Sequence, residues 1–192
     1  MKKFFVLACA AATFSLAAGS AMADSIAGRV GLTGRMGFHL PANGDYGPFK
    51  NSTDAGFIAG GGIIFGIDNH FAVETDITHS WFESDIGDFG VTNVSLGGQY
   101  RFILEQPKLV PYLGAGLDLL LIDADNGLTV DTTLGAHVSA GVDYFFLKQL
   151  ALTAEAKFVV APDTDIKGPN GVKGNFNPNS FTSTIGIRYF FN

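Results

Sequence analysis

The sequence predicts an all-β protein, an eight-stranded antiparallel up-and-down transmembrane β-barrel. Three observations lead to this fold class. Apolar and polar residues alternate with a period of two along most of the chain, as in strands with unlike faces. After the N-terminal leader, no segment approaches the length of about 18 apolar residues that indicates a spanning helix. The connections between the predicted strands alternate between short and long, which is typical of barrels that cross a membrane.

Residues 1–23 are predicted to form a cleaved secretory signal peptide. Lys2 and Lys3 supply a positive n-region, Phe4–Ala18 is an apolar run, and Ala21-Met22-Ala23 offers small residues at the cleavage site. An uncleaved helical anchor is the alternative, but the apolar run is shorter than the roughly 20 residues that a spanning helix needs. We therefore expect a mature chain of residues 24–192 that forms one domain.

The composition excludes several classes of function. Cys9 is the only cysteine and leaves with the predicted leader, so the mature chain has no disulfide and no thiolate metal site. Without Lys2 and Lys3, ten basic residues stand against 18 acidic ones, a formal charge of −8, which argues against nucleic acid as a partner. No cofactor and no metal are expected. A chain that is 47% hydrophobic and lacks spanning helices can still enter a membrane as a closed barrel.

The most informative alternation runs over Ile26–Leu40. One face has no polar side chain, and it consists of Ile26, Gly28, Val30, Leu32, Gly34, Met36, Phe38 and Leu40. The other face carries Arg29, Arg35 and His39, the ionisable groups of the segment. At about 3.3 Å per residue the segment would reach roughly 50 Å, far longer than an average strand of about 5–6 residues.

Seven further segments show the same two-faced pattern. The clearest sets Phe71, Val73 and Ile77 against Glu74 and Asp76, whereas the segment 56–67 is the least decisive because one of its faces is mostly glycine. The eight predicted strands cover 26–40, 56–67, 71–81, 93–102, 112–121, 133–146, 150–160 and 181–191. Aromatic residues gather near the strand ends and fit two interfacial girdles: Phe71, Trp81, Tyr100, Phe102, Tyr144, Phe146, Tyr189 and Phe191.

The connections predict which end of the barrel carries the loops. Short turns are expected at Asp68–His70, Leu104–Lys108 and Leu147–Gln149. Long loops rich in Gly, Pro, Asn and Asp are expected at Pro41–Asp54, Glu83–Gly90, Asp123–Thr129 and Pro162–Pro178. Both termini would then lie at the short-turn, periplasmic end.

Ten charged residues on the polar faces decide which face points outward. They are Arg29, Arg35, Arg101, Lys157 and Arg188 with Glu74, Asp76, Asp118, Asp143 and Glu155. A basic residue in the middle of the lipid face costs about 2–4 kcal/mol, against a total stability of about 5–15 kcal/mol. These groups are therefore expected to form a charge network inside the lumen, where five bases and five acids can pair. A soluble, lipocalin-like barrel is the alternative, because it would show the same alternation with its faces reversed.

Three short motifs resemble small outer-membrane barrels of the OmpA-barrel and OmpW-like superfamily. Val110–Leu117 is similar to the PYxGAGL strand start of these proteins, and Gly141–Phe146 resembles the GVDY-aromatic strand end of the OmpW-like group. Tyr189-Phe190-Phe191 resembles the C-terminal aromatic signal read by the barrel-assembly machinery, although the chain ends on Asn192. The resemblance implies a location in the outer membrane of a Gram-negative bacterium, with its lipids and lipopolysaccharide as partners. For the OmpW-like group it implies a porin-like conduit for small, hydrophobic molecules.

The lumen residues allow a structural and a functional interpretation. An eight-stranded barrel has an interior just wide enough for side chains to fill, so a structural network of ion pairs is favoured over a narrow polar conduit. The main interpretation is an integral outer-membrane protein with a structural or surface-interaction role, no catalysis and no known small-molecule ligand. The loop carboxylates could share divalent cations with lipopolysaccharide phosphates, but simple hydration is favoured.

A lipid A-modifying enzyme is the remaining alternative. His137 and Ser139 have the His-x-Ser spacing of lipid A deacylases, which resembles a base and a nucleophile on one face of a strand. Both are predicted on the lumen face, where an acyl chain would not reach them. The stretch Asp123–Gly127 suggests a calcium loop, but its glycine comes one position early and position twelve is Leu134, so a turn is favoured. His39 and His70 are expected at strand ends, facing water or headgroups.

Overall fold

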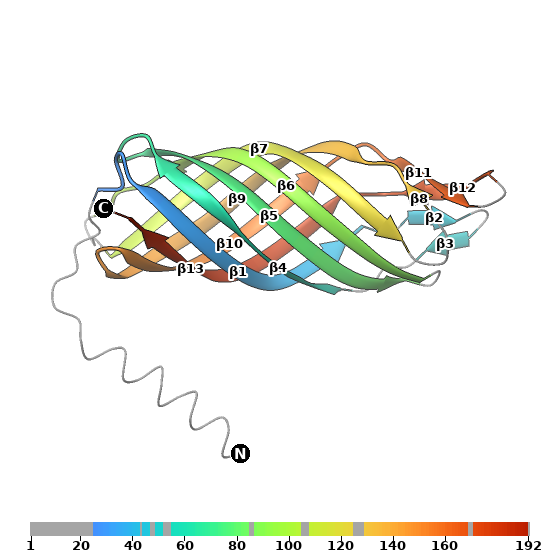
Figure 1. Ribbon diagram of the computed structural model, residues 1–192, viewed down its shortest axis with the longest axis horizontal. Helices are drawn as coiled ribbons and strands as arrows, with labels where there is room; N and C mark the ends of the chain where they lie inside the picture. The colour runs from blue at the N-terminus through green and yellow to red at the C-terminus, as the bar shows by residue number, and fades with distance from the viewer. Residues whose placement is uncertain are drawn as a thin grey trace, which may run out of the picture.

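A computed structural model describes residues 25–42, 44–46, 49–51, 55–84, 87–104, 108–124, 129–168 and 171–191. The predicted signal peptide lies outside these residues. Eight antiparallel strands form a closed barrel in the order β1-β13-β10-β9-β7-β6-β5-β4 (Figure 1). Their bounds are β1 Val30–Pro41, β4 Gly56–Gly66, β5 Phe71–Ser84, β6 Gly87–Arg101, β7 Leu109–Ala124, β9 Thr133–Leu147, β10 Leu150–Val160 and β13 Ser180–Phe190. The predicted fold class is confirmed.

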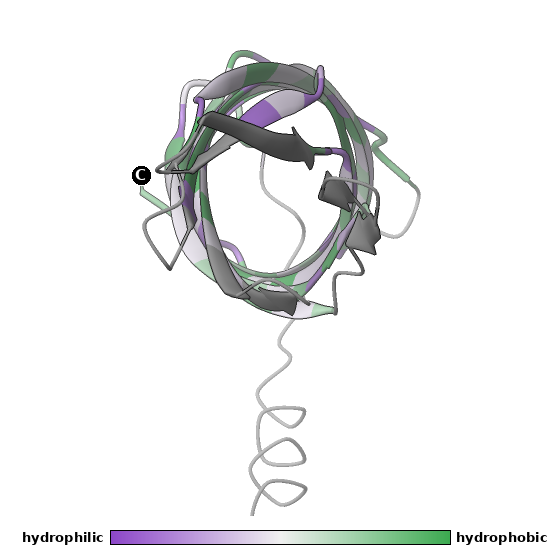
Figure 2. Ribbon diagram, turned by 90° about the vertical axis from the view of Figure 1, so that its right-hand side faces the viewer, coloured by the Kyte–Doolittle hydropathy of each residue, from purple (hydrophilic) through white to green (hydrophobic). Residues whose placement is uncertain are grey.

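The barrel closes between the first and the last of these strands. β1 pairs with β13 from Gly31 opposite Phe190 to Pro41 opposite Ser180, so neither strand has a free edge. The view along the axis shows an unbroken ring (Figure 2). Within the described part of the chain, no helix is long and apolar enough to cross a membrane.

The first strand begins four residues later than its sequence pattern predicts. A turn covers residues 27–28, where Gly28 has a φ of 72°, a conformation that glycine adopts without strain. The turn places Ile26 inside the barrel, where it is 5% exposed, so its predicted position on the outward apolar file is wrong. Periodicity did not detect the turn because Gly28 fits either a strand or a turn.

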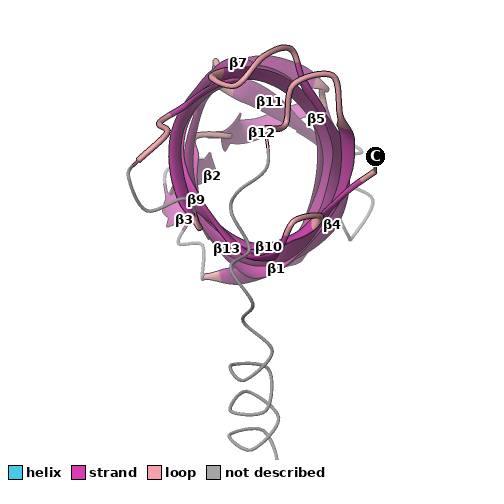
Figure 3. Ribbon diagram, turned by 90° about the vertical axis from the view of Figure 1, so that its left-hand side faces the viewer, coloured by secondary structure: helices cyan, strands magenta, loops and turns pink. Residues whose placement is uncertain are grey.

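A second sheet stands where three of the long loops were predicted. Its strand order is β3-β2-β12-β11-β8, and it lies at the end of the barrel opposite the C-terminus (Figures 1 and 3). The bounds are β2 Gly44–Tyr46, β3 Phe49–Asn51, β8 Thr129–Val130, β11 Thr164–Gly168 and β12 Gly171–Phe176. Such short strands lack the long apolar alternation that marks the barrel strands, so they were wrongly predicted as loops.

The predicted loop Glu83–Gly90 is also different in the structure. β5 and β6 remain paired as far as Ser84 opposite Gly87, which leaves residues 85–86 as the connection. Pairing satisfies backbone hydrogen-bonding groups that an irregular loop would leave to water. The rule of short turns at one end and long connections at the other therefore holds for three of the four predicted long loops.

The charged side chains of the barrel strands lie on the inner face, and the outer face is apolar. Side chains such as Leu117 and Ile185, both 67% exposed, point outward, whereas Asp143 and Arg188 are fully buried inside. Apolar side chains that would be a liability in water are favourable against acyl chains. The structure thus has the inside-out arrangement of a membrane barrel, opposite to that of a lipocalin-like barrel.

Aromatic residues form two outward belts, one near each end. At the end that carries the second sheet, Phe38 pairs across strands with Phe57 and Phe57 with Trp81, and the rings of Phe57 and Trp81 stack at 6.1 Å. At the other end, the ring of Tyr100 makes edge-to-face contacts with two aromatic rings. The ring centres lie 5.1 Å apart for Phe71 and 5.0 Å apart for Phe102. Two such belts are expected where a barrel meets the two membrane interfaces.

The turn between β4 and β5 is closed by Asp68. Its Oδ1 accepts hydrogen bonds of 2.7 Å from the backbone N–H groups of His70 and Phe71. These bonds favour the ionised carboxylate and lower the pKa of Asp68 below its usual value. His70 is exposed in this turn, as predicted.

Candidate functional site in the barrel lumen

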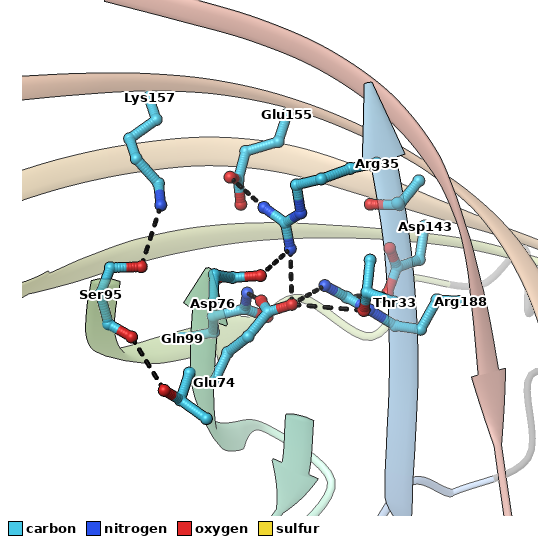
Figure 4. Close-up of polar contacts among 12 residues, drawn as sticks. Thr33, Arg35, Glu74, Asp76, Ser95, Gln99, Asp143, Glu155, Lys157 and Arg188 are labelled. Atoms are coloured by element: carbon cyan, nitrogen blue, oxygen red, sulfur yellow. Dashed lines mark hydrogen bonds and ion pairs between the residues drawn. The ribbon is translucent and has the colours of Figure 1, made fainter. Parts of the chain in front are cut away.

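The centre of the lumen holds a cluster of buried ion pairs. Arg35 on β1 is its hub: its Nη2 lies 2.6 Å from Glu74 Oε1 and 2.9 Å from Asp76 Oδ1, and its Nη1 lies 2.7 Å from Glu155 Oε1. These residues come from three different strands, as Figure 4 shows. Each points inward because the strand pattern puts every second residue on the lumen face. The cluster therefore joins β1, β5 and β10 across the barrel interior.

A second arginine extends the cluster towards the end where the chain terminates. Arg188 on β13 has its Nη2 2.6 Å from Glu74 Oε1 and its Nη1 2.8 Å from Asp143 Oδ2. The Asp143 oxygen also accepts a bond of 2.5 Å from Arg101. Arg101 and Arg188 are each at most 1% exposed. Burying such charges is tolerated only because each guanidinium has a carboxylate partner.

Neutral side chains complete the hydrogen bonding of these charges. Tyr112 donates to Glu155 Oε2 at 3.0 Å, and Gln99 donates to Glu74. The guanidiniums of Arg101 and Arg188 lie 5.6 and 5.8 Å from the centre of the Tyr112 ring, within cation–π range. These contacts connect β7 to the cluster and add to the link with β6, so the network of ion pairs and hydrogen bonds includes residues of β1, β5, β6, β7, β9, β10 and β13.

A separate polar group lies on β6, β7 and β9. His137 Nδ1 is 2.7 Å from Asp118 Oδ2, and Asn93 donates to the other Asp118 oxygen at 2.8 Å. Glycines make room for it: a Cβ on Gly116 would lie 2.7 Å from the His137 ring. The carboxylate thus fixes the orientation of the histidine within the wall of the lumen.

An apolar plug fills the lumen at the end where the chain terminates. It consists of Ile26, Ile64, Ala72, Val110, Phe145, Ala151 and Phe190, all of them buried. The rings of Phe145 and Phe190 stack at 5.8 Å in this plug. Ile26 enters it from the turn that precedes β1. A hydrated ion moving along the axis would meet the ion-pair cluster and then this apolar layer.

The opposite half of the lumen opens into a cavity. Counted together with the open solvent at its mouth, the space in it is about 580 Å³, and Arg35, Glu155 and Lys157 are its charged lining residues in the part of the chain that the structure describes. A smaller space of about 250 Å³ lies further in, next to Glu74, Asp76 and His137, and it shares Glu155 and Lys157 with the larger cavity. The described residues contain no group of three His, Cys, Asp or Glu side chains that could hold a metal ion.

The family of the protein follows from its sequence over nearly its whole length. The family described as "Outer membrane protein beta-barrel domain" matches residues 8–191. The chain belongs to this family. Its place is therefore the outer membrane of a Gram-negative bacterium, and the long connections and the second sheet form the extracellular end. The comparison with curated proteins finds no match.

Several solved outer-membrane barrels have a similar fold. OprG from Pseudomonas aeruginosa is 16% identical, with a TM-score of 0.70, over 86% of this chain and 97% of that one. Neisserial surface protein A is 20% identical, with a TM-score of 0.60, over 87% and 99%. Outer membrane protein W of E. coli is 18% identical, with a TM-score of 0.51, over 86% and 98%. At these identities the similarity concerns the fold, which agrees with the predicted OmpA-barrel and OmpW-like superfamily.

The ten residues of the predicted charge network occupy four places. Seven of them meet in the central cluster: Arg35, Glu74, Asp76, Arg101, Asp143, Glu155 and Arg188. Asp118 pairs with His137 instead, and Lys157 lies between the two spaces of the open half of the lumen.

Arg29 departs from the expected pairing. Its guanidinium lies over the Phe190 ring at 5.4 Å and donates to the backbone carbonyls of Phe191, Lys148 and Phe190. The cause is the turn at residues 27–28, which keeps Arg29 outside β1 at the periplasmic rim of the barrel.

Sequence reasoning missed several members of the lumen. His39 was expected to face water or headgroups, but it is 6% exposed and its Nδ1 lies 3.1 Å from Ser80 Oγ inside the barrel. Tyr112 and Gln99 were not recognised as partners of the charges. Their inward positions were readable from the alternation, but the distance across the lumen to Glu155 or Glu74 was not. The partner of His137 was also missed, since Asp118 lies on the neighbouring strand.

Proposed function

We propose that the protein is an integral outer-membrane barrel with a structural or surface-interaction role, and that it conducts neither ions nor solutes. The observation that carries this proposal is the double closure of the lumen, by the ion-pair cluster around Arg35 and Arg188 and by the apolar plug around Phe145. An ion would have to break buried pairs, each break costing about 3–5 kcal/mol, and then lose its hydration in the plug.

The outer surfaces fit this role. The lipid-facing files and the two aromatic belts supply contacts to outer-membrane lipids and lipopolysaccharide, and the second sheet lies at the end of the barrel that faces the outside. Among the loop carboxylates, for which simple hydration is favoured over divalent cations shared with lipopolysaccharide, Asp54, Asp85 and Asp125 lie outside the described residues. The C-terminal Tyr189-Phe190-Phe191 supports recognition by the barrel-assembly machinery during biogenesis.

Conductance in planar bilayers tests the proposal. The mature protein is inserted from detergent, insertion is checked by protease protection, and a general porin serves as the positive control. We expect no stepwise current in KCl at either polarity. Regular current steps from the wild-type protein would refute the closed-lumen function and favour the second candidate, a conduit. The observation that supports a conduit is the cavity that opens to solvent.

A lipid A-modifying activity is disfavoured by the position of its candidate residues. His137 and Ser139 are 8% and 9% exposed and lie inside the lumen, whereas acyl chains contact the outer face. His137 is also engaged by Asp118 at 2.7 Å. We expect unchanged lipid A mass spectra after overexpression; loss of an acyl chain that depends on Ser139 would contradict this.

A further inference from the structure

Lys157 is a buried cation that makes no ion pair with a carboxylate among the described residues. It is 8% exposed, and its one hydrogen bond within the described residues is a long one, 3.4 Å from Nζ to Ser95 Oγ on the opposite wall (Figure 4). By contrast, Arg35, Arg101 and Arg188 each make at least one ion pair of 2.9 Å or less. An ammonium has three donors, so most of the hydrogen-bonding capacity of Lys157 is unused by the protein.

The outer cavity in which Lys157 lies has a net positive lining. Of its three charged residues, Arg35 and Glu155 neutralise each other at 2.7 Å, which leaves Lys157, whose charge also acts on the carboxylates of Asp76 and Asp118. The carboxylates of Glu74 and Asp76 border the inner space instead, and both engage Arg35. An anion that enters from the extracellular side therefore meets the ammonium before it meets these carboxylates.

The remaining lining of the outer cavity is divided into a polar and an apolar part. Ser180, Thr182 and Thr184 contribute hydroxyl groups to the lining from β13. This strand is next to Lys157, which is paired with Thr182. Half-buried Asn93 contributes a buried Oδ1 that has no hydrogen-bond partner among the described residues. The apolar part is formed by Ile58, Val91, Leu120, Val159 and Phe176.

We propose that this cavity is a binding site for a small organic monoanion with an apolar body, such as a short-chain carboxylate. The carboxylate lies against Lys157 and the β13 hydroxyls, and the apolar body packs against Val91, Leu120 and Phe176. The cavity is a blind site because the ion-pair cluster and the apolar plug close the lumen behind it. Binding, and not passage, is the event that the cavity supports.

Calorimetric titration of the protein in lipid nanodiscs tests this proposal, with empty nanodiscs as the blank. The probes are hexanoate, hexylammonium, 1-hexanol and acetate. We expect saturable binding of hexanoate, weaker binding of acetate because it lacks the apolar body, and no saturable binding of the other two. Equal binding of 1-hexanol, binding of hexylammonium, or no saturable heat with hexanoate would each overturn the proposal.

Three variants assign the binding to Lys157. Lys157→Met keeps the apolar stem and should weaken hexanoate binding about tenfold or more, since a charge-assisted hydrogen bond is lost. Lys157→Arg should retain most of it. Lys148→Met, the same change in the exposed turn between β9 and β10, is the matched control and should leave binding unchanged. Folding of each variant is checked by the heat-dependent shift in electrophoretic mobility.

Unchanged affinity in Lys157→Met would overturn the assignment. The outcome is independent of the conductance test: a conducting wild-type barrel with an intact Lys157 site would refute only the closed-lumen function. A barrel that shows no conductance and does not bind hexanoate would refute only the proposed binding site.

Discussion

At the scale of single residues, the lumen is organised by arginines that serve several carboxylates at once. Arg188 contacts Glu74 at 2.6 Å and Asp143 at 2.8 Å and donates from Nε to Thr33 Oγ1 at 2.9 Å, while its side chain is fully buried. Removal of the arginine would leave two buried carboxylates with fewer partners. The planar guanidinium suits this role because it presents five N–H donors in a fixed fork that matches the geometry of carboxylates, whereas the ammonium of a lysine has three donors.

We expect Arg188→Met to lower the free energy of unfolding by about 3–5 kcal/mol, the cost of breaking a buried ion pair from one side. The measurement is reversible urea unfolding in lipid vesicles. Arg29→Met is the matched control: Arg29 is only half-buried and lies over Phe190, so its loss should cost about 1 kcal/mol. Equal effects of the two changes would show that the network contributes no special stability.

At the scale of the strand, alternation fixes which side chain meets lipid. Leu117 lies near the middle of β7, is 67% exposed and is paired with Leu96 on β6 and Ala136 on β9. Its neighbours along the strand, Gly116 and Asp118, point into the lumen. A charge is therefore stabilised at position 118 and penalised at position 117, although the two positions are adjacent in the chain.

We expect Leu117→Arg to destabilise the barrel by about 2–4 kcal/mol, the cost of an arginine at the bilayer midplane. Ile103→Arg is the control, because Ile103 is equally apolar and 57% exposed but lies beyond the end of β6, where the cost falls to about 0–1 kcal/mol. Urea unfolding in vesicles measures both. A Leu117→Arg protein as stable as the wild type would place this face in water.

At the scale of the whole molecule, the lumen has an open extracellular half and two closures in series behind it. The apolar layer of Val91, Leu120, Ile122, Val159, Ala161 and Phe176 lines the mouth, and the ion-pair cluster and the periplasmic plug follow. The two closures rest on different physics: paired charges in the cluster and close apolar packing in the plug. Loss of one should therefore not open the other.

We expect Phe145→Ala to weaken the plug without opening the barrel. Phe145 is 1% exposed, so its removal should lower stability by about 3–5 kcal/mol, while the ion pairs of Arg101 and Arg188 still block the axis. Tyr144→Ala, the adjacent outward residue, is the control and should cost less. Stepwise current from the Phe145→Ala protein in planar bilayers would show that the cluster alone is not a barrier.

The sequence by itself determined the number of barrel strands, their faces and the residues that must be hidden from lipid. Arg35, Glu74 and Asp143 could be assigned to the lumen because a two-residue period leaves no other place for a charge in a membrane strand. The family resemblance rested on motifs within these same strands, which the match over residues 8–191 confirms.

Only the tertiary structure decided which lumen residues meet and where the interior is open. Contacts across a barrel join residues far apart in the chain, such as Arg35 with Glu155, and nothing in a local pattern sets that distance. The same is true of Lys157: the alternation marks it as one more lumen charge, and only the structure shows that it makes no ion pair among the described residues. The two-residue period of a strand determines which way each side chain points, whereas the pairing register and the length of the side chain determine which residue it contacts.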